Sequence, residues 1–355
     1  MAASPGAATA LVMTAAALET LADPSLPAFA CPRCHGALDR AADAYRCRPC
    51  AAVYPVVLGI PDFRLFPDPW IGFDDDRDKA RRLAALVEGR SFADAVRTYW
   101  EITPSTPRPL AERFIEHVLG AERRASDWLD WLDGVEPPAA PGCWLDVGCG
   151  TGDLIAAGAR RGITIVGVDI ALRWLVVARR RETLAGRAAQ LVCANGEHLP
   201  FPPGAFSRVV SLGTLEHCRD ADRLVADARR VLRQGGVMRV TTVNRYSLLP
   251  EPHVGVWGVG IVPRRWADRY VRWRSGQRYL HHRPLSPREV ARGFRRAGFS
   301  SVRVGAAAVL AADRSRLGGA AAWAAPVYER LRTGPVVGSL IRWIAPLLDA
   351  RGVAA

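Results

Sequence analysis

A glycine-rich turn lies between a short apolar run and a helical pattern in residues 143–161. The run from Cys143 to Val147 is typical of a buried strand, and the turn after it is Gly148-Cys149-Gly150-Thr151-Gly152. A strand that passes through glycines into a helix lets a ligand approach bare backbone at the N-terminus of that helix. Dinucleotide-binding loops have the spacing GxGxxG, whereas this turn is GxGxG, which argues against a bound NAD or FAD.

An acidic residue follows the next predicted strand. Residues 163–168 are apolar, and Asp169 comes directly after them. A carboxylate at the end of this strand, next to the glycine turn, can accept hydrogen bonds from both hydroxyls of a ribose. The turn and the acid together therefore predict a site for a cofactor that contains a nucleoside.

Three further apolar segments, 191–194, 206–212 and 237–243, continue the alternation of predicted strands and helices. In this order the motifs resemble the class I S-adenosylmethionine-dependent methyltransferases, in the branch that includes quinone-biosynthesis methyltransferases. The resemblance is close over residues 141–250 and looser to about residue 305. It implies an α/β fold, a Rossmann-like sheet with helices on both faces, and S-adenosylmethionine as the cofactor.

The resemblance also implies roles for individual residues. Asp146 and the glycine turn would border the methionine end of the cofactor, Asp169 would hold the ribose, and Ile170 would lie against the adenine. Asn195 would accept a hydrogen bond from the adenine amine, or else it is a turn residue without a ligand. Leu212 would lie beside the sulfonium. The complete set of implied cofactor residues is Asp146, Gly148, Cys149, Gly150, Gly152, Asp169, Ile170, Asn195, Gly196 and Leu212.

Methyl transfer from a sulfonium needs mainly alignment and exclusion of water, and a base only where the acceptor must lose a proton. His217, just past the fourth strand, is the catalytic candidate; the alternative is a histidine that packs at a helix entry without titrating. Some quinone O-methyltransferases of this branch bind a divalent cation here through acidic residues. This chain has Glu216 but Gly213 one turn earlier, which argues against such a site.

Four cysteines near the N-terminus form two CxxC pairs, Cys31 with Cys34 and Cys47 with Cys50. Two such knuckles bring four thiolates into the tetrahedron that Zn²⁺ prefers, and a closed site of this kind is structural. The alternative is two disulfides, although nothing in the sequence indicates an oxidising compartment. Residues 29–63 resemble the small zinc-ribbon proteins that activate tRNA, rRNA and protein methyltransferases.

Most of the excess positive charge lies in one part of the chain. The net charge is +13, and 18 arginines stand against four acidic residues between Arg223 and Arg303. Here Trp266, Tyr270 and Trp273 follow helical spacing among the arginines. This pattern fits an anionic membrane surface, a lipid-like acceptor or RNA. The alternative is an aromatic face that packs on the core, with the arginines solvated.

We therefore expect a cytoplasmic methyltransferase, in peripheral contact with a membrane if the aromatic stripe binds lipid. The favoured acceptor is a small or lipid-like molecule, such as a quinone precursor or a secondary metabolite. RNA methylation is the competing activity, although the Asn/Asp-Pro-Pro-aromatic motif is missing after the fourth strand. A cofactor-binding scaffold that docks a partner is the non-enzymatic alternative. The oligomeric state stays open.

The expected organisation has five parts, and no apolar run reaches the length of a membrane-spanning helix. Within the helical linker, Asp74, Asp75 and Asp76 are expected to form a solvated turn. The parts are a flexible leader (1–28), a zinc ribbon (29–64), a helical linker (65–140), a methyltransferase domain (141–311) with a lid insertion (246–284), and a helical C-terminal extension (312–355).

Overall fold

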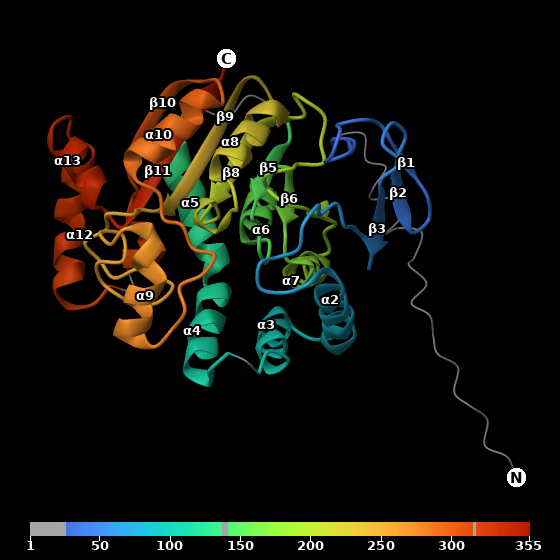
Figure 1. Ribbon diagram of the computed structural model, residues 1–355, viewed down its shortest axis with the longest axis horizontal. Helices are drawn as coiled ribbons and strands as arrows, with labels where there is room; N and C mark the ends of the chain where they lie inside the picture. Colours follow the sequence, from blue (N-terminus) through green and yellow to red (C-terminus); the bar gives the residue numbers. More distant parts are fainter. Residues whose placement is uncertain (1–25, 105, 137–140, 315–316) are drawn as a thin grey trace, which may run out of the picture.

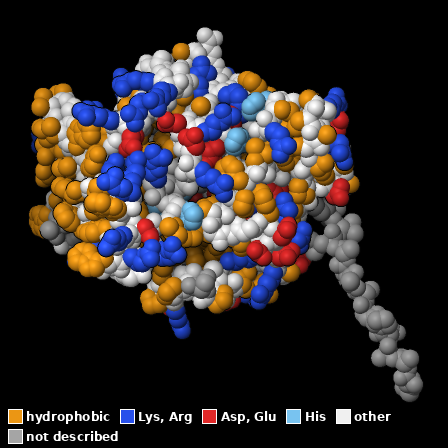
Figure 2. Space-filling model, viewed as in Figure 1, with side chains coloured by type: hydrophobic (Ala, Val, Ile, Leu, Met, Phe, Trp, Pro, Cys, Tyr) orange, Lys and Arg blue, Asp and Glu red, His pale blue; other side chains and the backbone are white. Residues whose placement is uncertain are grey.

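The computed structural model describes residues 26–104, 106–136, 141–314 and 317–355. Most of the expected leader, 1–25, therefore lies outside the described residues. Figure 1 shows a large α/β unit in the centre, with a small sheet beside it and helices α12 (Gly319–Arg332) and α13 (Val337–Ile344) on the opposite side. In the same view, apolar side chains are exposed on the side of these two helices (Figure 2).

The central sheet has seven strands in the order β10-β11-β9-β8-β5-β6-β7. Neighbouring strands from β9 to β7 are parallel, so their carboxyl ends meet at one edge. The ranges are β5 (Trp144–Val147), β6 (Ile165–Asp169), β7 (Leu191–Cys193), β8 (Phe206–Leu212), β9 (Leu232–Val243), β10 (Phe299–Ala306) and β11 (Leu347–Ala354). The expected Rossmann-like sheet is thus confirmed.

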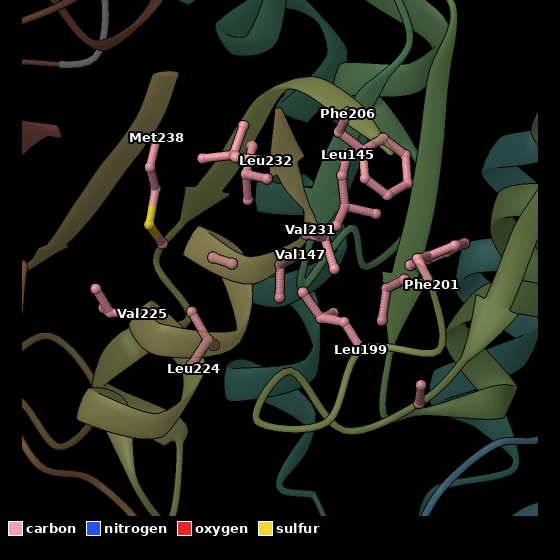
Figure 3. Close-up of a cluster of buried hydrophobic side chains, with 14 of the residues drawn as sticks. Leu145, Val147, Leu199, Phe201, Phe206, Leu224, Val225, Val231, Leu232 and Met238 are labelled. Carbon is pink, nitrogen blue, oxygen red and sulfur yellow. The ribbon is translucent and has the colours of Figure 1, made fainter. Parts of the chain in front are cut away.

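Helices cover both faces of this sheet. One face packs against α8 (Ala221–Val231) and α10 (Pro287–Arg296), and the other against α5 (Ala121–Val135), α6 (Asp153–Ala159) and α7 (Leu172–Leu184). Figure 3 shows the hydrophobic core between the sheet and α8, which includes Leu145 and Val147 of β5 and Leu224 and Val225 of α8. Strands buried on both faces have to be apolar throughout, which is why they stand out in the sequence.

The small sheet pairs antiparallel in the order β1 (Leu38–Arg40), β2 (Ala44–Cys47), β3 (Val53–Val57) and β4 (Ile60–Pro61). It docks at the β7 edge of the central sheet: the Phe63 N–H donates to the Cys193 carbonyl at 2.7 Å, and the Ala30 N–H to the Pro200 carbonyl at 2.9 Å. Phe63 is fully buried among the rings of Phe29, Tyr45 and Tyr54, and Phe29 in turn packs against Phe201 of the central unit. The ribbon therefore covers a strand edge that would otherwise be free to pair.

The linker folds as α2 (Phe73–Val87), α3 (Phe92–Glu101), α4 (Arg108–Leu119) and then α5. The prediction of a solvated turn at residues 74–76 is wrong for Asp76. Asp74 and Asp75 are exposed in the first turn of α2, where the helix dipole favours them, but Asp76 is fully buried. Its carboxylate accepts from Arg64 at 2.6 Å and from Arg173 at 2.8 Å.

The helical extension expected over 312–355 is correct only in part. Helices α12 and α13 form, after the short α11 (Ala311–Arg314), but the last helix ends at Ile344. Pro346 cannot continue a helix, and the chain then enters the sheet as β11 between β9 and β10. Alternate residues of β11 are buried, as period-2 packing requires. The sheet therefore extends well beyond residue 311.

The insertion at 246–284 carries helix α9 (Arg264–Ser275) and a small core of its own. Ala267 and Val271 face that core, while Trp266 and Trp273 are 55% and 76% exposed. The alternative in which the aromatic face packs on the core therefore holds only for Tyr270, which is partly buried against that core, and is wrong for the two tryptophans. Among the described residues, the helices are all too short or too polar to cross a bilayer.

Replacing Asp76 by alanine should lower the free energy of unfolding by about 3–5 kcal/mol, because it leaves buried guanidinium groups without a compensating carboxylate. Asp75→Ala, one residue earlier but exposed, is the matched control and should cost less than about 1 kcal/mol. Urea unfolding measures both. Equal effects of the two variants would show that the buried carboxylate is not a structural requirement.

Candidate functional site

A cavity of about 310 Å³ opens at the edge where the carboxyl ends of β5, β6, β7 and β8 meet. This edge of a parallel α/β sheet is where ligands bind in folds of this kind. The lining comes from the four strand ends, from α7 and from the linker: Phe66, Asp68, Pro69, Trp70, Val147, Gly148, Gly150, Val168, Asp169, Ile170, Ala171, Arg173, Trp174, Ala194, Gly196, Glu197, Gly213, Thr214, His217, Cys218 and Arg219.

The glycine turn forms one wall of the cavity. Gly148, Gly150 and Gly152 all have positive φ, at 83°, 50° and 74°. A side chain at Gly148 would collide with Thr214, so this position also needs glycine for space. Gly152 is the N-cap of α6, and the turn therefore presents backbone N–H groups at a helix N-terminus.

Asp169 lies at the end of β6 and faces the same cavity. Its Oδ2 accepts from the Gly150 N–H and its Oδ1 from the Ala171 N–H, both at 2.8 Å. Burial raises the pKa of Asp169, although the two backbone N–H groups oppose this effect. Each carboxylate oxygen keeps a lone pair for a further donor, so two neighbouring hydroxyls of a ligand can bind here.

Several expected cofactor residues lie behind the cavity wall. Asp146, Cys149, Gly152 and Leu212 do not line it. Asp146 is buried, and its burial, together with the nearby Asp153 and Asp169, raises the pKa of its carboxyl well above the ordinary value. A cationic ligand group above the turn would stabilise the ionised form.

The structure gives Asn195 a different role from the expected one. Its side chain is fully buried and does not line the cavity. Its Oδ1 accepts from the Leu65 N–H at 2.7 Å, and its Nδ2 donates to the Phe66 carbonyl at 3.0 Å. The amide is therefore committed to the backbone of the linker, which corrects the adenine contact implied for it. Its neighbour Gly196 does line the cavity.

His217 ends a short 3-10 helix, η2 (Leu215–His217), that follows β8, and it lines the cavity as expected. It is not alone: His253 and His282, both from the insertion, place ring nitrogens within 4.8 Å of each other and of His217. Burial lowers the pKa of His217, and burial with the two neighbouring imidazoles lowers the pKa of His282 to about 3. Burial thus favours the neutral imidazole of His217, in which one ring nitrogen can accept a hydrogen bond.

Sequence reasoning missed the contribution of the linker to the site. Phe66, Asp68, Pro69 and Trp70 form part of the cavity wall. The segment has no periodicity, and only its two prolines and its aromatic residues set it apart from an ordinary loop. Its position follows from Asn195 and from Asp68, which accepts a hydrogen bond from Arg173 at 2.8 Å.

The four cysteines of the ribbon converge as predicted. Cys31 Sγ lies 3.6 Å from Cys50 Sγ, and Cys34 Sγ lies 3.4 Å from Cys47 Sγ. These separations are far from the roughly 2.05 Å of a disulfide and close to the edge of a tetrahedron of thiolates around zinc, about 3.8 Å for Zn–S bonds of 2.3 Å. The donor set fits a structural Zn²⁺ ion.

Comparison with known proteins adds independent information. Residues 145–240 match the family model described as a methyltransferase domain. A ubiquinone biosynthesis O-methyltransferase of Idiomarina loihiensis is 35% identical over 149 residues, which are 42% of this chain and 57% of that protein. The enzyme of the same name from Paracidovorax citrulli is 32% identical over 161 residues, or 45% and 62% of the two chains. The chain thus spans about three-fifths of the length of these relatives.

Solved structures with a similar arrangement are more distant. The geranyl diphosphate C-methyltransferase of Streptomyces coelicolor is 16% identical, with a TM-score of 0.44, and the match covers 66% of this chain and 80% of that one. The phosphoethanolamine N-methyltransferase 2 of Haemonchus contortus is 18% identical, with a TM-score of 0.42 and coverage of 63% and 51%. By sequence, residues 145–240 thus match a methyltransferase domain, and the cavity lies at the carboxyl ends of the strands in that part of the chain.

Proposed function

We propose that the protein transfers the methyl group of S-adenosylmethionine to a hydroxyl of a small or lipid-like acceptor, such as a quinone precursor. One observation carries the proposal: the glycine turn and the Asp169 carboxylate line one cavity together with His217. The names of the relatives, ubiquinone biosynthesis O-methyltransferases, favour an oxygen acceptor.

The adenosine end of the cofactor offers neutral hydroxyls and a ring, whereas its methionine end carries an ammonium and a carboxylate. The proposed site has different groups for each end. Asp169 receives the ribose hydroxyls, and Ile170 lies beside the adenine. The methionine carboxylate binds at the N-terminus of α6. The N–H groups of Gly148 and Gly150 do not take part, because they donate to the Val168 carbonyl and to the Asp169 carboxylate. The buried Asp146 beneath the turn supports the methionine ammonium, which would return its raised pKa toward the ordinary range.

The acceptor occupies the end of the cavity near His217 and Trp70. Trp70 packs against His281 and His282, with ring centroids 5.0 Å and 5.8 Å away, so an aromatic surface stands beside the histidines. A phenolic ring stacks on such a surface while its hydroxyl points toward His217. His217 then serves the loss of the hydroxyl proton that O-methylation requires.

Asp169→Ala should weaken binding of S-adenosylmethionine by about 1.5–3 kcal/mol, roughly 10- to 150-fold, because charged hydrogen bonds to the ribose are lost. Calorimetric titration with the cofactor measures the effect, and urea unfolding confirms that the variant is folded. Asp75→Ala should bind the cofactor as the parent does. Unchanged affinity in a folded Asp169→Ala protein would contradict the proposed cofactor site.

The acceptor class is tested with methyl-labelled cofactor and a series of phenolic quinone precursors with short and long isoprenoid tails. Label should appear on the phenolic oxygen. Tight cofactor binding without transfer to any phenol would contradict the proposed acceptor and favour a cofactor-binding scaffold.

We also propose that the ribbon holds one Zn²⁺ ion through Cys31, Cys34, Cys47 and Cys50. Four thiolates close the coordination shell, so the ion is structural. The ribbon shares a core with the methyltransferase domain, where Phe29 packs against Phe201 with ring centroids 5.8 Å apart. Zinc therefore supports the ribbon and, through the ribbon, the β7 edge of the sheet.

Replacing Cys31 and Cys34 by serine should remove this zinc, because two of its four ligands are lost. Elemental analysis measures the metal, and hydrogen exchange should become faster in β1–β4 and along β7. The matched control is Cys143→Ser with Cys218→Ser, which lie outside the ribbon and should keep its zinc. A Cys31/Cys34 variant with parental zinc content and exchange would refute the site.

The third part of the proposal is contact with an anionic membrane. The insertion adjoins α13: the Leu248 N–H donates to the Ile344 carbonyl at 3.1 Å, and Tyr246 lies beside Trp343. Exposed apolar side chains continue over both parts: Tyr246, Leu248, Leu249, Trp257, Ile261, Trp266, Trp273, Trp323, Val327, Leu331, Val336, Val337, Leu340 and Ile344. Arginines stand among them, with Arg265 over the ring of Trp266 and Arg274 over that of Trp273. Such a surface suits a bilayer with anionic headgroups and would bring a lipid-like acceptor to the enzyme.

Changing Arg269, Arg272 and Arg274 together to glutamine should weaken binding to phosphatidylglycerol-containing vesicles about 100-fold, since each arginine near an anionic surface contributes about 1 kcal/mol. Vesicle sedimentation at several salt concentrations measures this. The control replaces Arg46, Arg81 and Arg82, which are exposed on the ribbon and α2, and so removes the same charge elsewhere. Equal weakening in both variants, or binding insensitive to salt, would contradict a membrane surface at α9.

A further inference from the structure

Three histidines from separate segments meet beside the cavity, and one of them, His217, lines it. His217 follows β8, His253 lies in the first half of the insertion, and His282 follows α9. The rings of His253 and His282 are stacked at 4.2 Å, and both meet the ring of His217 nearly edge-on, at 4.7 Å and 5.0 Å. Nitrogens of all three rings lie within 4.8 Å of one another.

The spacing of the nitrogens fits a bound cation. His217 Nδ1 and His282 Nδ1 are 3.2 Å apart. Two imidazole nitrogens that each lie 2.0–2.1 Å from a tetrahedral zinc are about 3.3 Å from one another. The backbone holds this pair together, because the Arg283 N–H, next to His282, donates to the carbonyl of Glu216, next to His217, at 2.6 Å.

Glu251 orients the third histidine. Its Oε1 lies 2.6 Å from His253 Nδ1, and its Oε2 accepts from the backbone N–H groups of His253 and Val254 at 2.9 Å and 3.1 Å. A carboxylate on one ring nitrogen fixes the proton there and leaves the other nitrogen as a ligand, which is the usual partner of a metal-bound histidine. Hydrogen bonding within the protein therefore leaves Nε2 of His253 for the metal.

We propose that His217, His253 and His282 bind a divalent first-row transition metal, with Zn²⁺ the preferred ion, and leave its fourth position open to the cavity. Three imidazoles with one open position are typical of a catalytic zinc site, whereas the four cysteines of the ribbon close their site. Nitrogen donors favour zinc and its neighbours over Mg²⁺ or Ca²⁺, which prefer oxygen. The carboxylate of Glu216 is not part of this group; its Oε2 accepts from the Thr242 hydroxyl at 2.6 Å.

The role of the ion rests on the proposed function. A hydroxyl oxygen of the acceptor would fill the fourth position, and the cation would lower the pKa of that hydroxyl. His217 would then assist loss of the proton through the metal rather than take the proton itself. Because two ligands come from the insertion, metal binding also joins the insertion to the end of β8.

Metal binding is tested on the full chain, stripped with a chelator and titrated with Zn²⁺ and with Co²⁺ as a spectroscopic probe. The parent should bind two ions, one with the absorption of sulfur-ligated Co²⁺ and one with that of nitrogen-ligated Co²⁺. His282→Gln and His253→Gln should each lose the second ion and keep the first. His281→Gln, the neighbouring residue outside the cluster, is the matched control and should keep both.

A finer test addresses Glu251. Glu251→Gln should weaken the second ion about 10- to 100-fold without changing the ribbon ion, as expected for loss of a carboxylate behind a ligand. A parent that binds only one ion, or a His282→Gln protein that still binds two, would overturn the site. Cofactor titration without metal is measured separately, so loss of the metal site and failure of the methyltransferase proposal give different results.

Discussion

The buried carboxylate of Asp76 is the interaction on which the rest of the architecture depends. It lies between Arg64, at the exit of the ribbon, and Arg173, in the first turn of α7, and it also accepts from the Leu172 N–H at 3.0 Å. Arg64 in turn donates to Asp62 and to the Ile170 carbonyl. Buried charges are tolerated only when they are paired, so the linker has to fold against α7 for the network to be stable.

This network determines where the cofactor site can form. Asp169 and Ile170 stand immediately before the segment that Arg64 and Asp76 hold, and the linker wall from Phe66 to Trp70 lies between the same partners. Asn195 adds a second attachment from the end of β7. The cavity thus requires the ribbon exit, the linker and the sheet at the same time, and the ribbon is part of the framework of the site rather than a tethered module.

The sequence predicts the centre of this protein well and its periphery poorly, for physical reasons. β8 is found at its predicted bounds because a strand buried on both faces is a continuous apolar run, and the glycine turn is marked by its backbone requirements. β11 is missed because its buried positions include Ala350, Gly352 and Ala354, which give almost no hydrophobic signal. Asp76 and the histidine cluster are missed because their partners are far away in sequence, up to 97 residues for Asp76 and Arg173. Local patterns do not report such pairs.

The position of β11 has a consequence for the order in which the sheet is assembled. Within the part of the chain that the structure describes, β10 pairs only with β11, and β11 lies between β10 and β9. Arg351 of β11 also joins Arg208 and Arg239 around the buried Glu136 carboxylate, which stands at the end of α5. During synthesis, β10 therefore has to wait for about forty later residues before it gains a neighbour, and these long-range pairings slow the final stage of folding. A ribosome that stalls before residue 347 would leave β10 without a partner, one edge of β9 uncovered and the buried Glu136 carboxylate short of a cation.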